Sequence, residues 1–296
     1  MTNKLLLKSF AVLALFAAAF TSCKSDRDDK NDEYSNMDEF YNKHRQEEQE
    51  FTIDSTGTGP IVGKQGTKLW SGDTSIFMFP NGGNVTYPFT IKLIELYPES
   101  DFMEFPMSTV SNSTLTEAAG AVRIRAFKNG TELVLKPGKT YYTELTDTNN
   151  LLQNMKVYYG ENKDVDVNWT QSADVAVTNA SSYYVGMTQM GWMMCAKPHT
   201  SSAPTTSVTI EAEGSGTENI DVYITAKNYF SVVRVKKLTS IPIPIGEDVR
   251  VVAMAMDQNK NYRLHYSKET VTTGMKIKLD LDVVTEQEVL NKLAAL

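Results

Sequence analysis

The segment AVRIRAFKNGTELVL, residues 121–135, decides the expected fold of this chain. Its first half alternates apolar and basic residues as far as Phe127, so one face of a strand would be buried and the other wet. Lys128-Asn129-Gly130-Thr131 then supplies a tight turn into an apolar run that ends at Leu135. Two strands joined by such a turn predict a β-hairpin.

Outward from this hairpin, residues 63–185 hold further short runs of β-branched and aromatic residues, separated by glycine, asparagine and proline. The longest is residues 85–96, where Pro88 places the start of the strand at a sheet edge or a bulge. Strands at regular spacing, without long helical patterns between them, predict a β-sandwich over residues 63–185.

Residues 186–284 repeat this organisation and predict a second, Ig-like sandwich. Its expected strands are residues 207–212, 221–226, 231–235, 249–256, 262–266 and 275–279. Thr285 and Glu288 then form a capping-box pattern, which predicts a C-terminal helix over residues 285–296. The expected fold class is therefore mainly β, with two consecutive β-sandwich (Ig-like) domains and a short C-terminal helix.

Several segments of the first body also resemble a known family. They are GKQGTKLW (63–70), FMFPNGGNVTYPFTIKLIELYPESDFM (77–103) and MSTVSNSTLTEAAGAVRIRAFKNGTELVLKPGKTY (107–141), with weaker echoes in residues 155–169 and 183–195. They resemble a module of Bacteroidota cell-envelope lipoproteins that is similar to the β-sandwich shared by ankyrins and netrin receptors. The matching positions are turn glycines and core apolar residues, so the resemblance implies a fold and an interaction module and carries over no catalytic residue.

The first 22 residues are typical of a signal peptide. Lys4 and Lys8 flank a short apolar run that leads to Thr21-Ser22-Cys23. Such a cysteine is the acylation site of bacterial lipoproteins, so we expect Cys23 to become a lipidated first residue that carries diacylglycerol and palmitate; Phe20, however, stands where leucine is usual. The alternative is an ordinary signal peptide followed by an incidental cysteine.

Residues 23–62 are expected to be an acid-rich tether with a short helix around residues 37–44, for which Ser35 is a candidate cap. Lys24 followed by Asp26, Asp28 and Asp29 resembles the surface-export signal of Bacteroidota lipoproteins; the alternative is a solvated linker. Asp54-Ser55-Thr56 matches the short O-glycosylation pattern of that phylum at Ser55, and the alternative there is a plain turn.

Composition excludes some partners and cofactors. The formal net charge of −7, without a basic stripe, argues against nucleic-acid binding. The two cysteines, Cys23 and Cys195, cannot form a disulfide framework if the first is acylated. The methionines at 187, 190, 193 and 194 next to Cys195 could suggest a soft-metal site, but flexible core packing is the favoured interpretation. We expect neither a metal nor a cofactor.

The sequence offers no recognisable catalytic motif. The three histidines, His44, His199 and His265, are widely separated. Carboxylates such as Glu95, Asp101 and Glu104 could pair as in glycosidases, but any acidic protein offers such pairs. The segment that starts at Asp257 resembles a calcium loop only in part, because it has neither the glycine nor the distal glutamate. No catalytic residue is expected, and a hydrolase is the least favoured class.

These patterns together predict a non-catalytic lipoprotein of the outer membrane, with its body on the cell surface, that acts as a binding or assembly subunit of an envelope protein complex. A periplasmic orientation is the alternative for its location. The alternative function is that of an accessory lipoprotein that binds a glycan or another polymer. Aromatic residues that could stack on sugars are Tyr141, Tyr142, Tyr158, Tyr159, Tyr183 and Tyr184.

Overall fold

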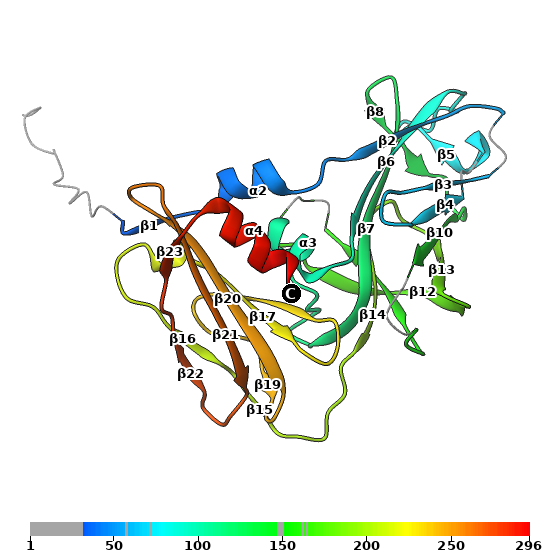
Figure 1. The fold of residues 1–296 in the computed structure, drawn as a ribbon. Coiled ribbons are helices and arrows are strands. Elements are labelled where there is room, and N and C mark those ends of the chain that lie inside the picture. The colour runs from blue at the N-terminus through cyan, green and yellow to red at the C-terminus, as the bar shows by residue number, and fades with distance from the viewer. Residues whose placement is uncertain (1–31, 57–58, 71–72, 147–150, 162, 164) are drawn as a thin grey trace, which may run out of the picture.

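The computed structural model describes residues 32–296 apart from 57–58, 71–72, 147–150, 162 and 164, and most of its regular structure is β-strand (Figure 1). The α-helices in this part of the chain are α2 (Asp38–His44), α3 (Glu99–Glu104) and α4 (Glu286–Ala294). Single 3-10 turns are η1 (Thr74–Ile76) and η2 (Thr217–Asn219). The mainly β class and the C-terminal helix predicted from the sequence are confirmed, and the Thr285–Glu288 capping box is formed.

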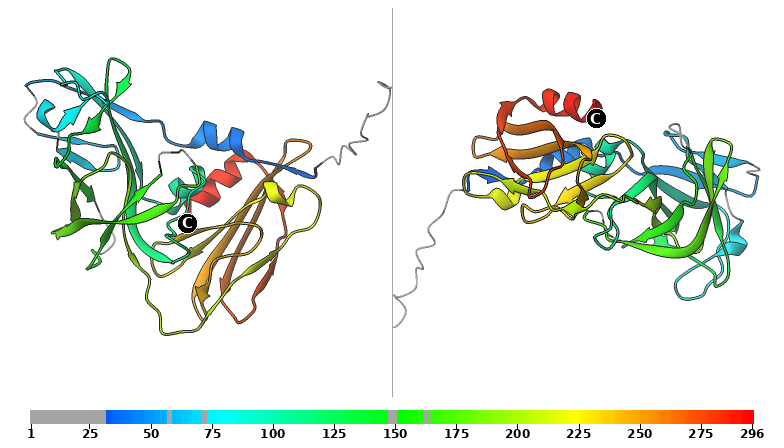
Figure 2. Two further views of the ribbon diagram at one scale, coloured as in Figure 1. Left: turned by 180° about the vertical axis from the view of Figure 1, so that it is seen from behind. Right: turned by 90° about the horizontal axis from the view of Figure 1, so that it is seen from below.

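Ten strands make one large sheet that curls into a nearly closed, barrel-like body (Figures 1 and 2). Hydrogen-bonded neighbours follow the order β2 (Gln49–Ile53), β6 (Phe89–Leu96), β7 (Thr116–Lys128), β14 (Gly191–Pro198), β11 (Lys156–Gly160), β12 (Trp169–Asn179), β13 (Ser182–Met187), β10 (Tyr141–Thr146), β4 (Lys68–Trp70) and β3 (Pro60–Val62). Strand β8 (Thr131–Glu132) pairs with β7, and β5 (Phe77–Met78) pairs with β9 (Val134–Leu135).

The hairpin turn predicted after residue 127 is confirmed. Lys128 pairs with Thr131, and the φ angles of Asn129 and Gly130 are 50° and 76°. Two consecutive positive φ angles are what a two-residue hairpin turn requires, and asparagine followed by glycine adopts them at little cost.

The smaller sheet has the order β18 (Val232–Val235), β17 (Asp221–Ala226), β20 (Asp248–Asp257), β21 (Tyr262–Thr270) and β23 (Asp282–Val284), and β1 (Tyr34–Ser35) also pairs with β20. Two further short pairs are β15 (Thr205–Thr206) with β19 (Ile243–Pro244), and β16 (Thr209–Glu211) with β22 (Lys276–Lys278). Among the strands that the structure describes, only β16 and β22 pair in parallel.

Strand pairing differs from the expected division into two Ig-like sandwiches. The predicted boundary between residues 185 and 186 falls inside β13, and β14 pairs with β7 and β11 of the large sheet. The chain leaves the large sheet only after Pro198. Alternation shows which face of a strand is buried but not which strands are its neighbours, so the sequence did not reveal a single curled sheet.

The N-terminal part of the described chain differs from the expected tether. Strand β1 pairs with β20 of the smaller sheet and β2 pairs with β6 of the large sheet, while Phe40 and Tyr41 of α2 are buried between them. The predicted short helix is confirmed, but it starts after Met37 without a side-chain cap, so Ser35 is not its cap. We call residues 34–53 the strap, because they join both sheets.

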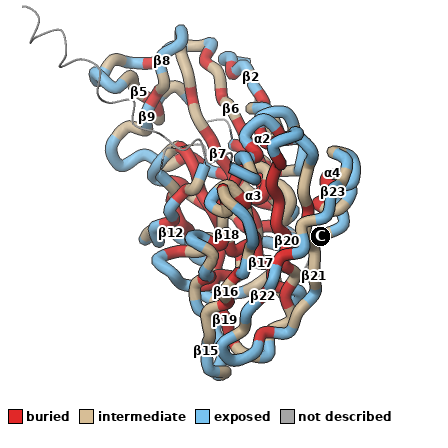
Figure 3. The backbone as a smooth tube through the Cα atoms, turned by 90° about the vertical axis from the view of Figure 1, so that its left-hand side faces the viewer, coloured by how far each residue is buried: buried red, intermediate tan, exposed pale blue. Residues whose placement is uncertain are grey.

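Three apolar clusters fill the molecule. The barrel core lies inside the large sheet, the far core lies on the outer side of the smaller sheet, and the shared core lies between the two sheets. Figure 3 shows buried segments along β7 and β20, which border the shared core. Residues of the shared core include Phe40, Phe102, Trp169, Trp192, Met194, Tyr223, Met254 and Val289.

The methionine-rich strand β14 has both faces buried. Met193 and Cys195 point into the barrel core, while Trp192 and Met194 point into the shared core. The sulfur atoms are therefore divided between two cores, which fits core packing. No group of three histidine, cysteine, aspartate or glutamate side chains placed to hold a metal ion occurs in the described part of the chain.

Candidate functional site

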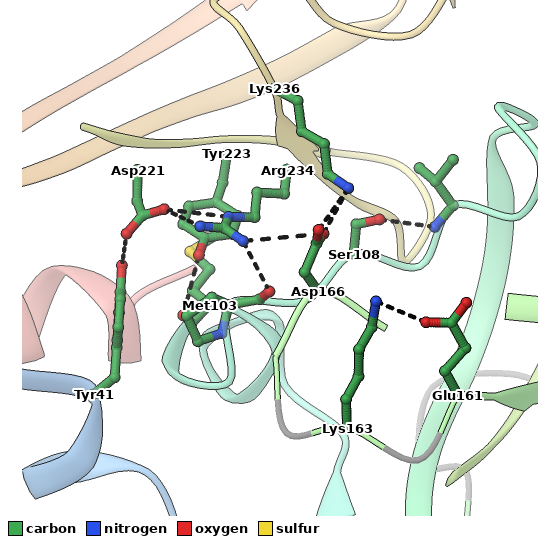
Figure 4. A network of polar contacts seen from close by, with 12 residues as sticks. Tyr41, Met103, Ser108, Glu161, Lys163, Asp166, Asp221, Tyr223, Arg234 and Lys236 are labelled. Atoms are coloured by element: carbon green, nitrogen blue, oxygen red, sulfur yellow. Dashed lines mark hydrogen bonds and ion pairs between the residues drawn. The ribbon is translucent and has the colours of Figure 1, made fainter. Parts of the chain in front are cut away.

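A polar network lies at the junction of the two sheets and contains the first candidate site (Figure 4). Asp221 on β17 accepts hydrogen bonds from the hydroxyl of Tyr41 on α2, at 2.7 Å, and from Nη2 of Arg234 on β18, at 2.6 Å. The same guanidinium lies 4.0 Å from Asp166, whose carboxylate is 2.7 Å from Nζ of Lys236. The strap, the smaller sheet and the loop before β12 thus meet in one set of contacts.

The polar side chains of this network pair with one another. Burial raises the pKa of Tyr41 well above its usual value, so this phenol stays neutral and donates to Asp221. Asp221 in turn forms an ion pair with Arg234, with Nη2 and Oδ1 2.6 Å apart. A cavity of about 120 Å³ has Tyr41, Asp221 and Arg234 in its wall. These contacts connect the strap to the smaller sheet and to the loop before β12.

A second, larger cavity of about 270 Å³ lies at the end of β20 and β21, beyond α3. Arg250 in its wall pairs with Glu99 of α3 at 3.3 Å, and burial raises the pKa of Glu99 to about 7 despite this cation. Asp248 accepts a hydrogen bond from Thr270 and pairs with Lys227 at 3.6 Å. Both of these carboxylates have partners in the same chain, and the cavity wall also contains Glu269.

The third candidate is a surface, which we call the outer face. It lies on the outside of five adjacent strands of the large sheet, β3, β4, β10, β13 and β12. Its large side chains are Val62, Trp70, Tyr142, Val175, Val177 and Tyr184, and all but the half-buried Tyr184 are exposed. The strand register explains why these side chains lie on the same face of the sheet. Tyr142 is directly opposite Trp70 and Tyr184 is directly opposite Val177, and directly opposed residues point to the same face.

The rings of the outer face are packed against one another. Tyr142 and Tyr184 stack with centroids 5.4 Å apart and an interplanar angle of 15°. The ring of Tyr142 also covers Gly186, where a Cβ would lie 3.1 Å from the tyrosine Cε1. The glycine therefore lets this ring lie close to the sheet, and Tyr142 still has 45 % of its surface exposed.

The sequence-predicted site residues at the N-terminus cannot be placed, because Cys23, Lys24, Asp26, Asp28 and Asp29 lie outside the described residues. Ser55 lies within them, in an exposed turn. There Asp54 accepts hydrogen bonds from the backbone and hydroxyl of Thr56. A turn and an accessible modification site are both consistent with this geometry.

The six tyrosines considered for sugar stacking do not form one surface. Tyr142 and Tyr184 lie on the outer face, whereas the other four are buried: Tyr141, Tyr158, Tyr159 and Tyr183. The 141–142 and 183–184 pairs follow the alternation expected of strands, with one ring inside and one outside.

The remaining candidate residues have structural partners. Glu95 is buried and accepts hydrogen bonds from Gln49, Gln65 and Thr67. The Asp257 carboxylate accepts hydrogen bonds from Asn259, Asn261 and Arg263, which leaves no calcium-loop geometry. The three histidines contact different partners: His44 pairs with Glu286, His199 with Glu117, and His265 with the backbone of Asp280.

The main residues that the sequence analysis missed are Trp70, Val175 and Val177 of the outer face. The sequence analysis predicted no strand at 174–178, and valines in such an alternating run are normally assigned to the core. Comparison with protein-family models, curated proteins and solved structures found no match to this chain.

Proposed function

We propose that this chain is a non-catalytic lipoprotein of the outer membrane, anchored through Cys23, that acts as a binding or assembly subunit of an envelope protein complex on the cell surface. Its resemblance to Bacteroidota envelope lipoproteins belongs to the same proposal. The smaller sheet and the β16–β22 pair enclose the far core, and on this layering we propose that the second half is an Ig-like module.

The observation that carries this proposal is the strap. Cys23 precedes Asp32 by nine residues, a length that spans at most about 30 Å when fully extended. From Tyr34 onward the chain pairs with β20 and then with β6. An anchor at Cys23 would therefore hold a folded body near the membrane by a short connection, as suits a subunit that works beside a membrane partner.

The polar groups of the interior support a binding role. Asp221 and Asp248 in the cavity walls, and Glu99 beside the second cavity, pair with arginine, lysine or hydroxyl groups of the same chain. Such pairs stabilise a scaffold, and the exposed outer face remains as the surface with large unpartnered apolar side chains.

The lipid anchor is tested by Cys23→Ala. We expect this variant to move from the membrane to the soluble fraction, because the described residues contain no helix long and apolar enough to cross a bilayer. The control is Cys195→Ala, a buried thiol whose loss should leave fractionation unchanged. A Cys23→Ala protein that still needs detergent for release would contradict the proposal.

Protease shaving of intact cells tests the orientation of the wild-type protein. We expect cleavage at the surface, in line with the proposed export signal at Lys24, Asp26, Asp28 and Asp29. Complete protection, with cleavage only after the outer membrane is permeabilised, would place the body on the periplasmic side instead.

A further inference from the structure

Strand β12 carries an inverted amphipathic pattern. Val175 and Val177 are 65 % and 56 % exposed, whereas Asp174, Ala176 and Thr178, which point to the other side, are only partly exposed. Asp174 even accepts hydrogen bonds from Tyr159 and Thr188 on the inner side. A sheet with one face on the core and one face in solvent is stabilised by apolar side chains on the inner face and polar side chains on the outer face. Strand β12 shows the reverse arrangement.

The exposed valines continue into a wider apolar surface. The cross-strand row Trp70–Tyr142–Gly186 ends beside Val175, and the next row runs from Val62 through Lys68, Glu144 and Tyr184 to Val177. Apolar side chains thus extend over five neighbouring strands, which places them side by side at the strand spacing of about 4.8 Å. A contiguous surface of this kind marks an interaction site more often than scattered exposed residues do.

The charge on this surface restricts what it can bind. Lys68 and Glu144, the charged pair within the two rows, neutralise each other at 3.2 Å, and Lys156 of β11, the exposed cross-strand partner of Val175, lies at the margin of the surface. The centre of the surface is therefore neutral and is complementary to another neutral surface, because a charged group brought there would lose its water without gaining a partner.

The described chain begins at the end of the molecule opposite the outer face. The chain enters at β1 beside the smaller sheet, while β3, β4, β10, β12 and β13 lie at the opposite end of the molecule in Figure 1 and in the reverse view of Figure 2. The outer face therefore lies far from the point at which the described chain begins.

We propose that the outer face is the docking surface for a protein partner with a flat, uncharged, apolar contact area, an inference that rests on the proposed function. Tyr142, Tyr184 and Trp70 are the central anchors, since aromatic side chains dominate the binding energy of such interfaces. A protein is favoured over a glycan because the valines at both margins offer no hydrogen bonds to sugar hydroxyls but bury readily against apolar side chains.

Photo-crosslinking in the cells that make the full chain tests this surface. Benzoylphenylalanine is introduced at Tyr142 or Val177, and at Val283 as a control that is 57 % exposed on the smaller sheet. We expect one outer-membrane protein, identified by mass spectrometry, to be linked from positions 142 and 177 and not from 283. Links from 283 alone, or links only between copies of this chain, would overturn the proposal.

The captured protein is then purified, and its affinity is measured for the wild-type chain and for two variants of the chain that each carry an added charge. Val177→Lys should weaken binding at least about tenfold, because a lysine would be buried without a partner, while Val283→Lys should change it less than about twofold. Equal unfolding midpoints show that both variants are folded. Unchanged affinity of Val177→Lys would contradict docking at the outer face.

The same variants and the copurification experiment also distinguish the remaining outcomes. Binding of cell-surface polysaccharide that Tyr142→Ala abolishes, without a protein crosslink, would replace the protein by a glycan. If an outer-membrane protein copurifies with the chain but is not linked from 142 or 177, the proposed function stands and only the surface is wrong. If no protein copurifies, the proposed function itself fails.

Discussion

Glu95 shows at the scale of one residue how this chain uses buried charge. Its side chain has no exposed surface, yet it accepts hydrogen bonds from Gln49 Nε2 and from the backbone N–H groups of Gln65 and Thr67, at 2.8–2.9 Å. Gln49 also accepts a hydrogen bond from the backbone of Lys64. These contacts join β2 to the loop after β3, across the gap between the two ends of the large sheet, where the carboxylate takes the place of a strand ladder.

Glu95→Ala should lower the free energy of unfolding by about 3 kcal/mol, because it leaves the buried backbone donor of Thr67, the part-buried backbone donor of Gln65 and the buried Gln49 amide without their acceptor. Urea unfolding followed by circular dichroism measures the loss. Glu50→Ala is the matched control, since Glu50 is on the same strand as Gln49 but exposed, and removing its pair with Lys92 should cost under about 1 kcal/mol. Equal losses for the two variants would show that the Glu95 contacts contribute little.

Helix α3 is the element whose existence was hardest to predict. It has six residues between Pro98 and Phe105, too few to show helical periodicity, and burial of Phe102 and Met103 in the shared core holds it in place. By contrast, the alternation at 121–127 predicted β7, and the Thr285–Glu288 pattern predicted the start of α4, because both are local signals.

The outer face was predictable only in part, again for a physical reason. Neighbouring tyrosines in β10 and β13 had to place one ring outside, so the exposure of Tyr142 and Tyr184 follows from period two. The exposed valines of β12 do not follow from it, because hydrophobicity alone assigns valine to the core. Strand order, which brings Trp70 beside Tyr142, depends on long-range pairing that a local pattern does not contain.

The three carboxylates of α3 make the stability of the molecule depend on pH. Burial raises the pKa of Glu99 and of Glu104 to about 7, and the neighbouring Asp101 adds to the shift of Glu104. Between about pH 4.5 and 7 the folded protein therefore holds protons that the unfolded chain has already lost. This contribution to stability is fully present below pH 4.5 and is lost as the pH rises towards 7.

The contribution of α3 to the free energy of unfolding should therefore decrease from pH 5 to pH 7. Glu104→Gln, which cannot ionise, should make the stability profile flatter across this window. Urea unfolding at half-unit pH steps measures the slope, with Glu47→Gln, an exposed position, as a control that keeps the wild-type slope. If Glu104→Gln keeps that slope too, the carboxyl of Glu104 is not what carries the pH dependence.

At the scale of the whole molecule, the shared core decides whether the two sheets behave as one body. Residues of both sheets, of the strap and of helices α3 and α4 meet in it, so neither sheet can lose its partner without exposing large apolar side chains such as Trp192 and Tyr223. Two Ig-like domains joined by a linker would instead keep separate cores and unfold separately. A single cooperative transition is therefore the expected behaviour of this fold.

Val251→Ala tests this cooperativity, because Val251 lies in the far core and the three tryptophans, Trp70, Trp169 and Trp192, are all in the large sheet. Removing two buried methyl groups should lower the free energy of unfolding by about 2 kcal/mol. The unfolding midpoint followed by tryptophan fluorescence should fall by the same amount as the midpoint followed by circular dichroism, although no tryptophan belongs to the far core. Val283→Ala, exposed on the same sheet, should leave both midpoints in place. A fluorescence midpoint that stays at the wild-type value while circular dichroism resolves an earlier transition would mean that the sheets unfold independently, and that the strap and the shared core do not make them a single unit.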